Sequence, residues 1–417
     1  MMPLPLPTEI VEYILDLAGA FPDLSVYQSP PYSLYSDRDL PLSDIALSAS
    51  SLFSLALVCK LWNTICTPRL YRCLAIVDDT AIDALLRTLE QSQITATVSG
   101  SVPLGSLTRH LIIALSDQAS ANDSRSERYE RRIERRFGNL GRLSRCLPHL
   151  EILSISTFTQ AWNMWDLPLP YYGKDFAATV TQTCAPSLLK LHLHQQAIIL
   201  FSRQEFRKLL KSSPNLIAIT GADVGDCIGC PVTLPYLPKL KYLVVNDRME
   251  HCDEIRHEDD RTPLLDHIHI HEGPLSSHWV HLLSSQGARL TSISLDLRFP
   301  EHLKNCSEYL SKFTKFCPNL SYLEIYIDNW LLFPRLEMLP PVERFGLHAE
   351  TDDTSVETIC KKLATIQSPS LKVIQIMNPG VFELFAFSDN VKNAWSPLVD
   401  HAFRVVDYDG RELGPPK

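Results

Sequence analysis

A chain of 417 residues with 39 Lys and Arg against 48 Asp and Glu has a formal charge of −9. This charge argues against a general polyanion-binding protein, because phosphate contacts require an excess of basic side chains. The start, MMPLPLPTEIVEYIL, lacks the basic region and cleavage site of a signal peptide, and no apolar run approaches the roughly 20 residues of a membrane-spanning helix. We therefore expect a cytoplasmic or nuclear protein whose eleven cysteines are reduced thiols.

The first seventy-odd residues contain three runs with the apolar spacing of a helix, at 10–17, 52–62 and 70–74. Thr8 can cap the first helix, and Pro68 can open the third one through Leu74. Three short helices cannot bury much apolar surface by themselves. We therefore expect this segment to bind a partner, and a helical cap on the domain that follows is the alternative.

Three stretches of this segment resemble the F-box family: LPTEI (6–10), LFSLALVCKLW (52–62) and LYRCL (70–74). The resemblance implies a three-helix hook that docks on a Skp-type adaptor and so joins a cullin-based ubiquitin ligase. Carried over by position, the adaptor-binding residues would be Leu6, Pro7, Ile10, Ile14, Leu55, Val58, Cys59 and Trp62. The chain departs from the family at 20–50, where members have a short connection and where Pro, Ser and Asp here predict a flexible loop.

The stretch RSERYERRIERRF (125–137) predicts a charge-dense helix with six arginines and three glutamates. Glu127 and Arg131 are four residues apart, so their ion pair would add a small stabilisation. We expect a solvated helix between the hook and the rest of the chain. A docking site for an acidic or phosphorylated partner is the alternative.

One phrase recurs from residue 148 onward: a proline (alanine in one copy), then apolar residues two, five and seven positions later. The copies are PHLEILSI (148–155), PSLLKLHL (186–193), PKLKYLVV (238–245), PLLDHIHI (263–270), ARLTSISL (288–295), PNLSYLEI (318–325), PPVERFGL (340–347) and PSLKVIQI (369–376). PNLIAITG (214–221) is a weaker copy, and TRHLIIAL (108–115) is a degenerate first copy. The alternation at the end of each copy predicts a half-buried strand, with the proline at the strand entry.

Amphipathic helices are predicted between these strands, at 203–212, 276–286, 304–317 and 354–367. A strand and a helix in every repeat resemble a leucine-rich repeat, whose stacked strands line the concave face of a horseshoe. The expected fold class is α/β: a three-helix F-box followed by an irregular leucine-rich-repeat solenoid of parallel strands and outer helices. An ordinary α/β domain with unrelated strand–helix alternation is the alternative.

The predicted domain order has four parts. The F-box occupies 1–75 with its loop at 20–50, and a linker with the charged helix and the degenerate first repeat occupies 76–145. The solenoid spans 146–378, and a C-terminal cap and tail span 379–417. The ending WSPLVDHAFRVVDYDGREL (395–413) is similar to that of many fungal F-box proteins with such repeats.

Alternation along the predicted strands gives each an apolar face and a polar face. In HIHIH (267–271) the two isoleucines point toward the core and the three histidines toward the other face. A solvated polar face is the default interpretation, and substrate recognition on the inner face of the horseshoe is the second, with tyrosines favoured as anchors. The candidate substrate-binding residues are Lys190, His192, His194, Tyr242, Asn246, His267, His269, His271, Asp296, Tyr322, Glu324 and Tyr326.

Cys227 and Cys230 have the spacing of a metal-binding or redox pair, with His251, Cys252 and His257 further along the chain. A second CxxC is missing and a repeat strand separates the two groups, so structural thiols are the expected state. We predict no metal, no cofactor and no catalysis, since neither a Gly-rich phosphate loop nor a GxSxG or HExxH motif is present.

These patterns support three hypotheses about function. The leading one is a non-catalytic substrate-recognition subunit of an SCF-type E3 ubiquitin ligase, with the F-box on a Skp-type adaptor and the repeats on an unknown protein target. It involves neither nucleic acid nor membrane. The alternatives are a leucine-rich-repeat scaffold outside any ligase and a metal-dependent or thiol enzyme built around Cys227 and Cys230.

Overall fold

The computed structural model describes residues 42–117, 127–159, 174–193, 201, 203–220, 234–246, 262–271, 277–298, 303–334, 336, 339–351, 355–378, 381–386 and 391–414. Two compact units make up the chain, Met1–Phe201 and Ser202–Lys417. The predicted first helix of the hook, with Leu6, Pro7, Ile10 and Ile14, lies outside the described residues. The predicted loop at 20–50 lies outside them up to residue 41.

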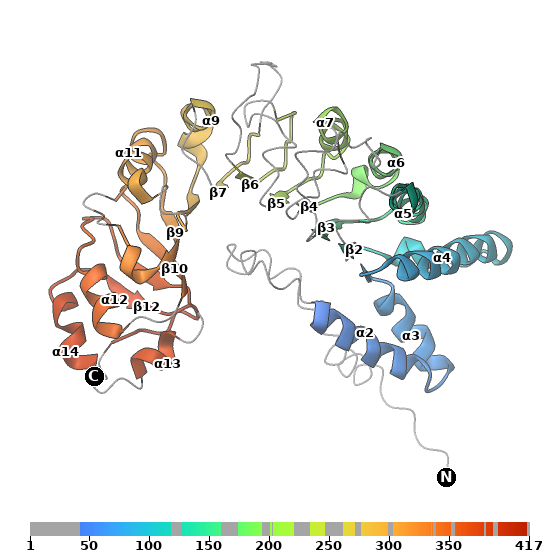
Figure 1. Ribbon diagram of the computed structural model, residues 1–417, viewed down its shortest axis with the longest axis horizontal. Coiled ribbons are helices and arrows are strands. Elements are labelled where there is room, and N and C mark those ends of the chain that lie inside the picture. Colours follow the sequence, from blue (N-terminus) through green and yellow to red (C-terminus); the bar gives the residue numbers. More distant parts are fainter. Residues whose placement is uncertain are drawn as a thin grey trace, which may run out of the picture. The chain divides into compact units, whose positions relative to one another are not determined.

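The described part of the first unit has two helices followed by strands that alternate with helices (Figure 1). Its four strands pair in chain order and all pairs are parallel. Its elements are α2 (Leu42–Ala56), α3 (Lys60–Leu70), β1 (Cys73–Ile76), α4 (Asp79–Ser99), η2 (Leu104–Leu107), β2 (His110–Asp117), α5 (Glu127–Arg145), β3 (Ile152–Thr159), α6 (Lys174–Thr183), η4 (Ala185–Ser187) and β4 (Lys190–Leu193).

The second unit continues the same alternation, and its strands β5 to β12 also pair in chain order and in parallel. Helices α9, α11 and α12 lie on one side of these strands (Figure 1). The elements are α7 (Arg203–Lys211), β5 (Ala218–Thr220), β6 (Tyr242–Asn246), β7 (His267–His271), α9 (Ser277–Gln286), η7 (Gly287–Arg289), β8 (Ser292–Asp296), α11 (Cys306–Phe316), β9 (Tyr322–Asn329), η8 (Trp330–Leu332), β10 (Arg344–Thr351), α12 (Val356–Leu363), β11 (Val373–Ile376), α13 (Val381–Ala386), α14 (Val391–Trp395), η9 (Ser396–Leu398) and β12 (Arg404–Val406).

The repeat phrase is confirmed as the unit of this fold. All nine copies form strands, β3 to β11, and each strand begins four residues after its copy starts. The degenerate first copy forms β2. The apolar residue two positions into each copy is buried in the turn before the strand, as Leu240 and Leu290 show, and the next apolar position points into the core, as at Leu243.

The proline of the phrase does not stand at the strand entry, as predicted, but four residues earlier, in the tight turn that leads to the strand. Pro186, for example, lies at the start of the short 3₁₀ helix η4. Proline suits this place because it fixes its own backbone angle and gives up an N–H that a helix start leaves unpaired.

Neighbouring repeats pack closely at these turns. The carbonyl of Thr291 accepts hydrogen bonds from the N–H groups of both Ser321 and Tyr322 in the next repeat, at 3.0 and 3.1 Å. A Cβ at Gly287 would lie 2.5 Å from the carbonyl oxygen of Phe316, closer than real Cβ atoms approach. The turn therefore requires glycine, because the backbone of the following repeat occupies the space of a side chain.

The structure corrects the predicted N-terminal helices. Pro68 does not open a third helix but lies inside α3, and the chain then enters β1, which contains Leu74 and pairs with β2. The first strand of the sheet therefore starts within the segment that resembles an F-box. The 21-residue helix α4 and the last strand, β12, were not predicted either.

The fold class is confirmed as α/β of the leucine-rich-repeat type. Each unit stacks parallel strands in chain order, with apolar side chains on one strand face turned toward the intervening helices. The predicted helices at 203–212, 276–286, 304–317 and 354–367 correspond to α7, α9, α11 and α12. Within the part of the chain that the structure describes, no helix combines the length and the apolar character needed to cross a bilayer.

Candidate functional site

Helices α2 and α3 form a hook with a small core of its own. Leu52, Ala56 and Cys66 are buried in it, and the partly buried Leu55 and Trp62 pack against them. The turn between the helices is fixed by the Val58 N–H, which donates to the carbonyl oxygen of Leu55 at 3.1 Å. A core this small cannot supply much stability.

The outer side of this turn carries a cluster of exposed apolar side chains, which we call the hook patch. Phe53, Leu57, Val58 and Leu61 are between 58 and 69% exposed. Phe53 and Leu57 are four residues apart around the end of α2, and Leu61 lies in the first turn of α3. Four exposed apolar side chains within nine residues around one turn are a feature of interaction surfaces.

The predicted adaptor-binding residues divide into two groups. Val58 and Cys59 lie at the exposed turn, and Cys59 occupies the N-cap position of α3. Leu55 and Trp62 instead turn toward the hook core, where their side chains are half-buried. Phe53, Leu57 and Leu61 were not among the predicted adaptor-binding residues. Their spacing of four residues along the predicted helical run 52–62 was the signal that could have identified them.

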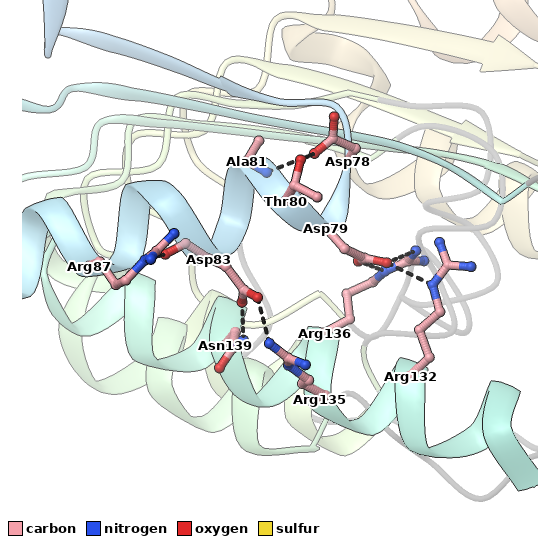
Figure 2. Close-up of polar contacts among 10 residues, drawn as sticks. All are labelled: Asp78, Asp79, Thr80, Ala81, Asp83, Arg87, Arg132, Arg135, Arg136 and Asn139. Carbon is pink, nitrogen blue, oxygen red and sulfur yellow. Dashed lines mark hydrogen bonds and ion pairs between the residues drawn. The ribbon is translucent and has the colours of Figure 1, made fainter.

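The arginine-rich helix α5 is not the solvated connection that we expected. Asp79 at the start of α4 accepts hydrogen bonds from Arg132 and Arg136, at 2.7 and 2.6 Å (Figure 2). One turn further, Asp83 accepts from Arg135 at 2.6 Å and from Asn139 at 2.7 Å (Figure 2). Helix α5 is thus fastened along the side of α4.

The same ladder continues at Arg142, which forms a two-pronged ion pair with Glu90 at 2.7 and 2.9 Å. Burial alone would raise the pKa of Asp79, but its hydrogen bonds to Arg136 and Arg132 and their positive charges outweigh burial and lower that pKa below its ordinary value. Arg136 is itself buried. The buried pair of Arg136 with Asp79 therefore helps to join α5 to α4, whereas each exposed pair adds little stability. Because these arginines already have carboxylate partners, the ladder gives no support to a docking site for an acidic partner on this face of α5.

On the second unit, the strand face that points away from the helices is polar, and its side chains line up across the strands in rows; we call it the polar face. The first row, at the strand starts, is Tyr242, His267, Ser292, Tyr322, Arg344, Val373 and Arg404. The second row, two residues further, is Val244, His269, Ser294, Glu324, Gly346, Gln375 and Val406.

A buried carboxyl group lies at the centre of the polar face. Glu324 is completely buried and accepts hydrogen bonds from the hydroxyl groups of Ser294, at 2.9 Å, and Tyr326, at 3.0 Å. Burial raises its pKa from 4.5 to about 7, although both hydrogen bonds act in the opposite direction. Near neutral pH, the proton occupancy of Glu324 is therefore sensitive to small changes in pH.

Aromatic rings surround this carboxyl group. Tyr242 stacks on His267 with ring centres 4.4 Å apart, and the His267 Nε2 atom lies 3.5 Å from the Ser294 hydroxyl. Tyr326 contacts His269 edge-on at 5.5 Å on one side and His348 at 5.2 Å on the other. Burial lowers the pKa of His267 to about 3, so its ring is neutral at physiological pH.

The expectation of a solvated polar face is therefore wrong for much of this surface. His269, Asp296, Glu324 and Tyr326 are no more than 2% exposed, and Asp296 is further held by a two-pronged ion pair with Arg298. Long polar side chains on adjacent strands cover one another, because parallel strands lie only about 4.8 Å apart. What remains accessible belongs mainly to the first row.

In the first unit, Lys190 and His192 lie on β4 and are half-buried. On the same face, His110 is buried, with its Nε2 atom 3.0 Å from the Ser154 hydroxyl. Burial, with a smaller contribution from the positive charges of His192 and Lys190, lowers the pKa of His110 to about 3.

Several other predicted residues cannot be placed. His194 lies outside the described residues, as do Cys227, Cys230, His251, Cys252 and His257. For Asn246 and His271 the structure describes the strand but not the side chain. Among the side chains it does describe, no three His, Cys, Asp or Glu residues are grouped as a metal ion would require.

No protein-family model matches this chain, and no curated protein matches its sequence. A crystal structure of the leucine-rich repeat-containing protein LegL7 from Legionella pneumophila aligns with 74% of this chain and 78% of that chain, at 12% identity and a TM-score of 0.29. A crystal structure of the yeast Rad7 and Elc1 complex aligns over 90% and 93%, at 13% identity and a TM-score of 0.26. At these TM-scores the likeness supports no conclusion about function.

Proposed function

We propose that this protein is a non-catalytic target-recognition subunit of an SCF-type ubiquitin ligase, in which the hook binds a Skp-type adaptor and the repeats bind the target. The observation that carries the proposal is the hook patch: Phe53, Leu57, Val58 and Leu61 expose apolar surface on a helical pair with a very small core. A partner that covers this patch would bury apolar surface and stabilise the hook. The F-box-like order of residues around Val58 suggests the class of partner.

The proposed mechanism is proximity. A target held on the repeats would have its lysines close to a ubiquitin-charged enzyme that the adaptor recruits. Holding the reacting groups together raises their effective concentration without any catalytic group on this chain. The polar face of the second unit supports the second half of the proposal, because it presents aromatic and charged side chains on a rigid set of strands.

The proposal predicts that Val58→Asp strongly weakens adaptor binding. Val58 is 66% exposed, so the substitution should leave the hook folded. An aspartate buried in an apolar interface would lose its hydration without an ionic partner, and we expect at least about a 30-fold loss of affinity, equivalent to about 2 kcal/mol. Calorimetric titration of the full chain with a purified Skp-type adaptor measures this loss.

Val98→Asp on α4 is the matched control, because Val98 is 85% exposed and lies far along a different helix. It should bind the adaptor as the native chain does. Equal affinities for the native chain and the Val58→Asp variant would contradict the proposed contact. No binding by the native chain would favour a repeat scaffold outside any ligase.

A further inference from the structure

Two arginines stand out on the first row of the polar face. Arg344 on β10 and Arg404 on β12 are both exposed, and one strand, β11, separates them. Neither guanidinium has a carboxylate within ion-pair distance among the described residues.

The side chain of Arg344 is held in place by neutral groups. Its Nη2 atom donates a hydrogen bond to the Gln375 side-chain oxygen at 3.0 Å. The Gln375 amide nitrogen in turn donates to the carbonyl oxygen of Tyr408 at 2.9 Å, which fixes the orientation of the amide. An arginine that is oriented in advance loses less side-chain entropy when it binds an anion.

An aromatic ring supports the same guanidinium. Arg344 lies over the ring of Tyr322, 5.7 Å from the ring centre. The Tyr322 hydroxyl in turn occupies the space above Gly346, where an added Cβ would lie 2.5 Å from it. Glycine at this strand position therefore leaves room for the Tyr322 side chain on which the guanidinium of Arg344 rests.

Four acidic side chains of the surrounding strands and turns have partners other than these two arginines. Glu324 in the second row is buried, and burial raises its pKa to about 7. Near neutral pH the carboxyl group is therefore partly protonated and carries less than a full negative charge. Three other carboxylates of neighbouring strands and turns form ion pairs of their own, which are Asp296–Arg298, Glu343–Lys372 and Asp407–Arg411.

We propose that the first row of the polar face, through Arg344 and Arg404, binds an acidic segment of a partner protein in extended form. This inference rests on the proposed function, because it names the chemistry of the target that the repeats would hold. Two strand spacings place the arginines about 10 Å apart. Carboxylates three residues apart in an extended polyproline II segment match that separation, because side chains there return to the same side every three residues with a rise of about 3.1 Å per residue.

The test uses the full chain and a fluorescein-labelled peptide of repeated Glu-Gly-Gly, with repeated Gln-Gly-Gly as the neutral counterpart. Fluorescence anisotropy should show binding of the acidic peptide only, with an affinity that falls as salt is added. Replacing both arginines, as Arg344→Gln with Arg404→Gln, should weaken binding about tenfold. Arg404→Gln alone removes an exposed side chain and tests the site even where the Arg344 change disturbs folding.

Arg289→Gln is the matched control, because Arg289 is an exposed arginine of the same unit that lies in the turn before β8. It should leave peptide binding unchanged. Equal binding of the acidic and neutral peptides, or native affinity in both arginine variants, would overturn the inference. Tighter binding of a single-stranded oligonucleotide of equal charge would also overturn it.

Adaptor binding separates this inference from the proposed function. The double arginine variant keeps the hook intact and should bind the Skp-type adaptor with native affinity. A chain that binds the adaptor but not the acidic peptide would refute the acidic target alone. A chain that binds the peptide through the two arginines but not the adaptor would refute the ligase and leave the peptide site standing.

Discussion

A Glu324→Gln variant should be less stable than the native protein at pH 4 and more stable at pH 8. Burial holds the pKa of Glu324 at about 7 in the folded chain, against an ordinary value of 4.5. Below pH 4.5 the group is protonated in both states and has no effect. Between pH 4.5 and 7 the unfolded chain releases the proton that the folded chain keeps, so the unfolding free energy decreases by about 3 kcal/mol as pH rises.

Glutamine removes this pH dependence because it carries no charge. It has one acceptor oxygen for the hydroxyl groups of Ser294 and Tyr326, so we expect a constant cost of about 1 kcal/mol. The net gain at pH 8 is then about 2 kcal/mol. Urea unfolding at several pH values measures the difference, and Glu308→Gln on the exposed side of α11 is the control. A variant that is less stable by the same amount at every pH would contradict the raised pKa.

The second large effect has the opposite dependence on pH. Burial lowers the pKa of His267 from 6.5 to about 3, so the folded chain keeps a neutral ring while the unfolded chain takes up a proton. The unfolding free energy is unaffected above pH 6.5 and decreases as pH falls from there toward 3, by about 5 kcal/mol in total. A His267→Phe variant keeps a ring to stack on Tyr242 and should lose this acid sensitivity.

Urea unfolding between pH 4 and 7 measures this second effect. His149→Phe is the control, because it makes the same substitution at an exposed histidine. An unchanged acid slope in His267→Phe would show that the ring is protonated in the folded state. Taken together, the two opposite dependences nearly cancel between about pH 4.5 and 6.5, so the two residues predict that the native protein is most stable in that range.

The repeat was predictable because every copy fills the same space. An apolar residue in the turn and at least one on the strand are required wherever one repeat packs on the next, so the phrase survives in copies as different as PNLIAITG, which ends in glycine, and PPVERFGL. Strand β1 was missed because its residues, Cys73–Ile76, also complete the F-box-like pattern. Strand β12 is three residues long, too short for alternation to be visible.

Helix α4 did have signals in the sequence. Asp78 caps its start by accepting a hydrogen bond from the Ala81 N–H at 2.7 Å, and Gly100 ends it with a φ of 70°. An acidic cap followed 22 positions later by glycine is typical of a helix with both ends marked. The partners of Arg132 and Arg136 could have been inferred only after this helix was in place, because ion pairs between helices depend on how the helices pack.

The candidate surfaces were predictable in position but not in exposure. Alternation places Tyr322, Glu324 and Tyr326 on one face, and the structure confirms that register. The alternation could not show that Glu324 and Tyr326 are buried, because their burial depends on the side chains of neighbouring strands that cover them. Arg344 stands at the same place in its repeat as Tyr322 does in the one before, so the repeat alignment alone could have added it to the face.

Hydrogen–deuterium exchange of the full chain, alone and with a Skp-type adaptor, tests the central claim most directly. The account predicts that the adaptor slows exchange in peptides that cover the hook patch, from Phe53 to Leu61, and leaves the strands of the second unit unchanged. Exchange that stays the same in the hook patch, or that slows only on the polar face, would contradict the account.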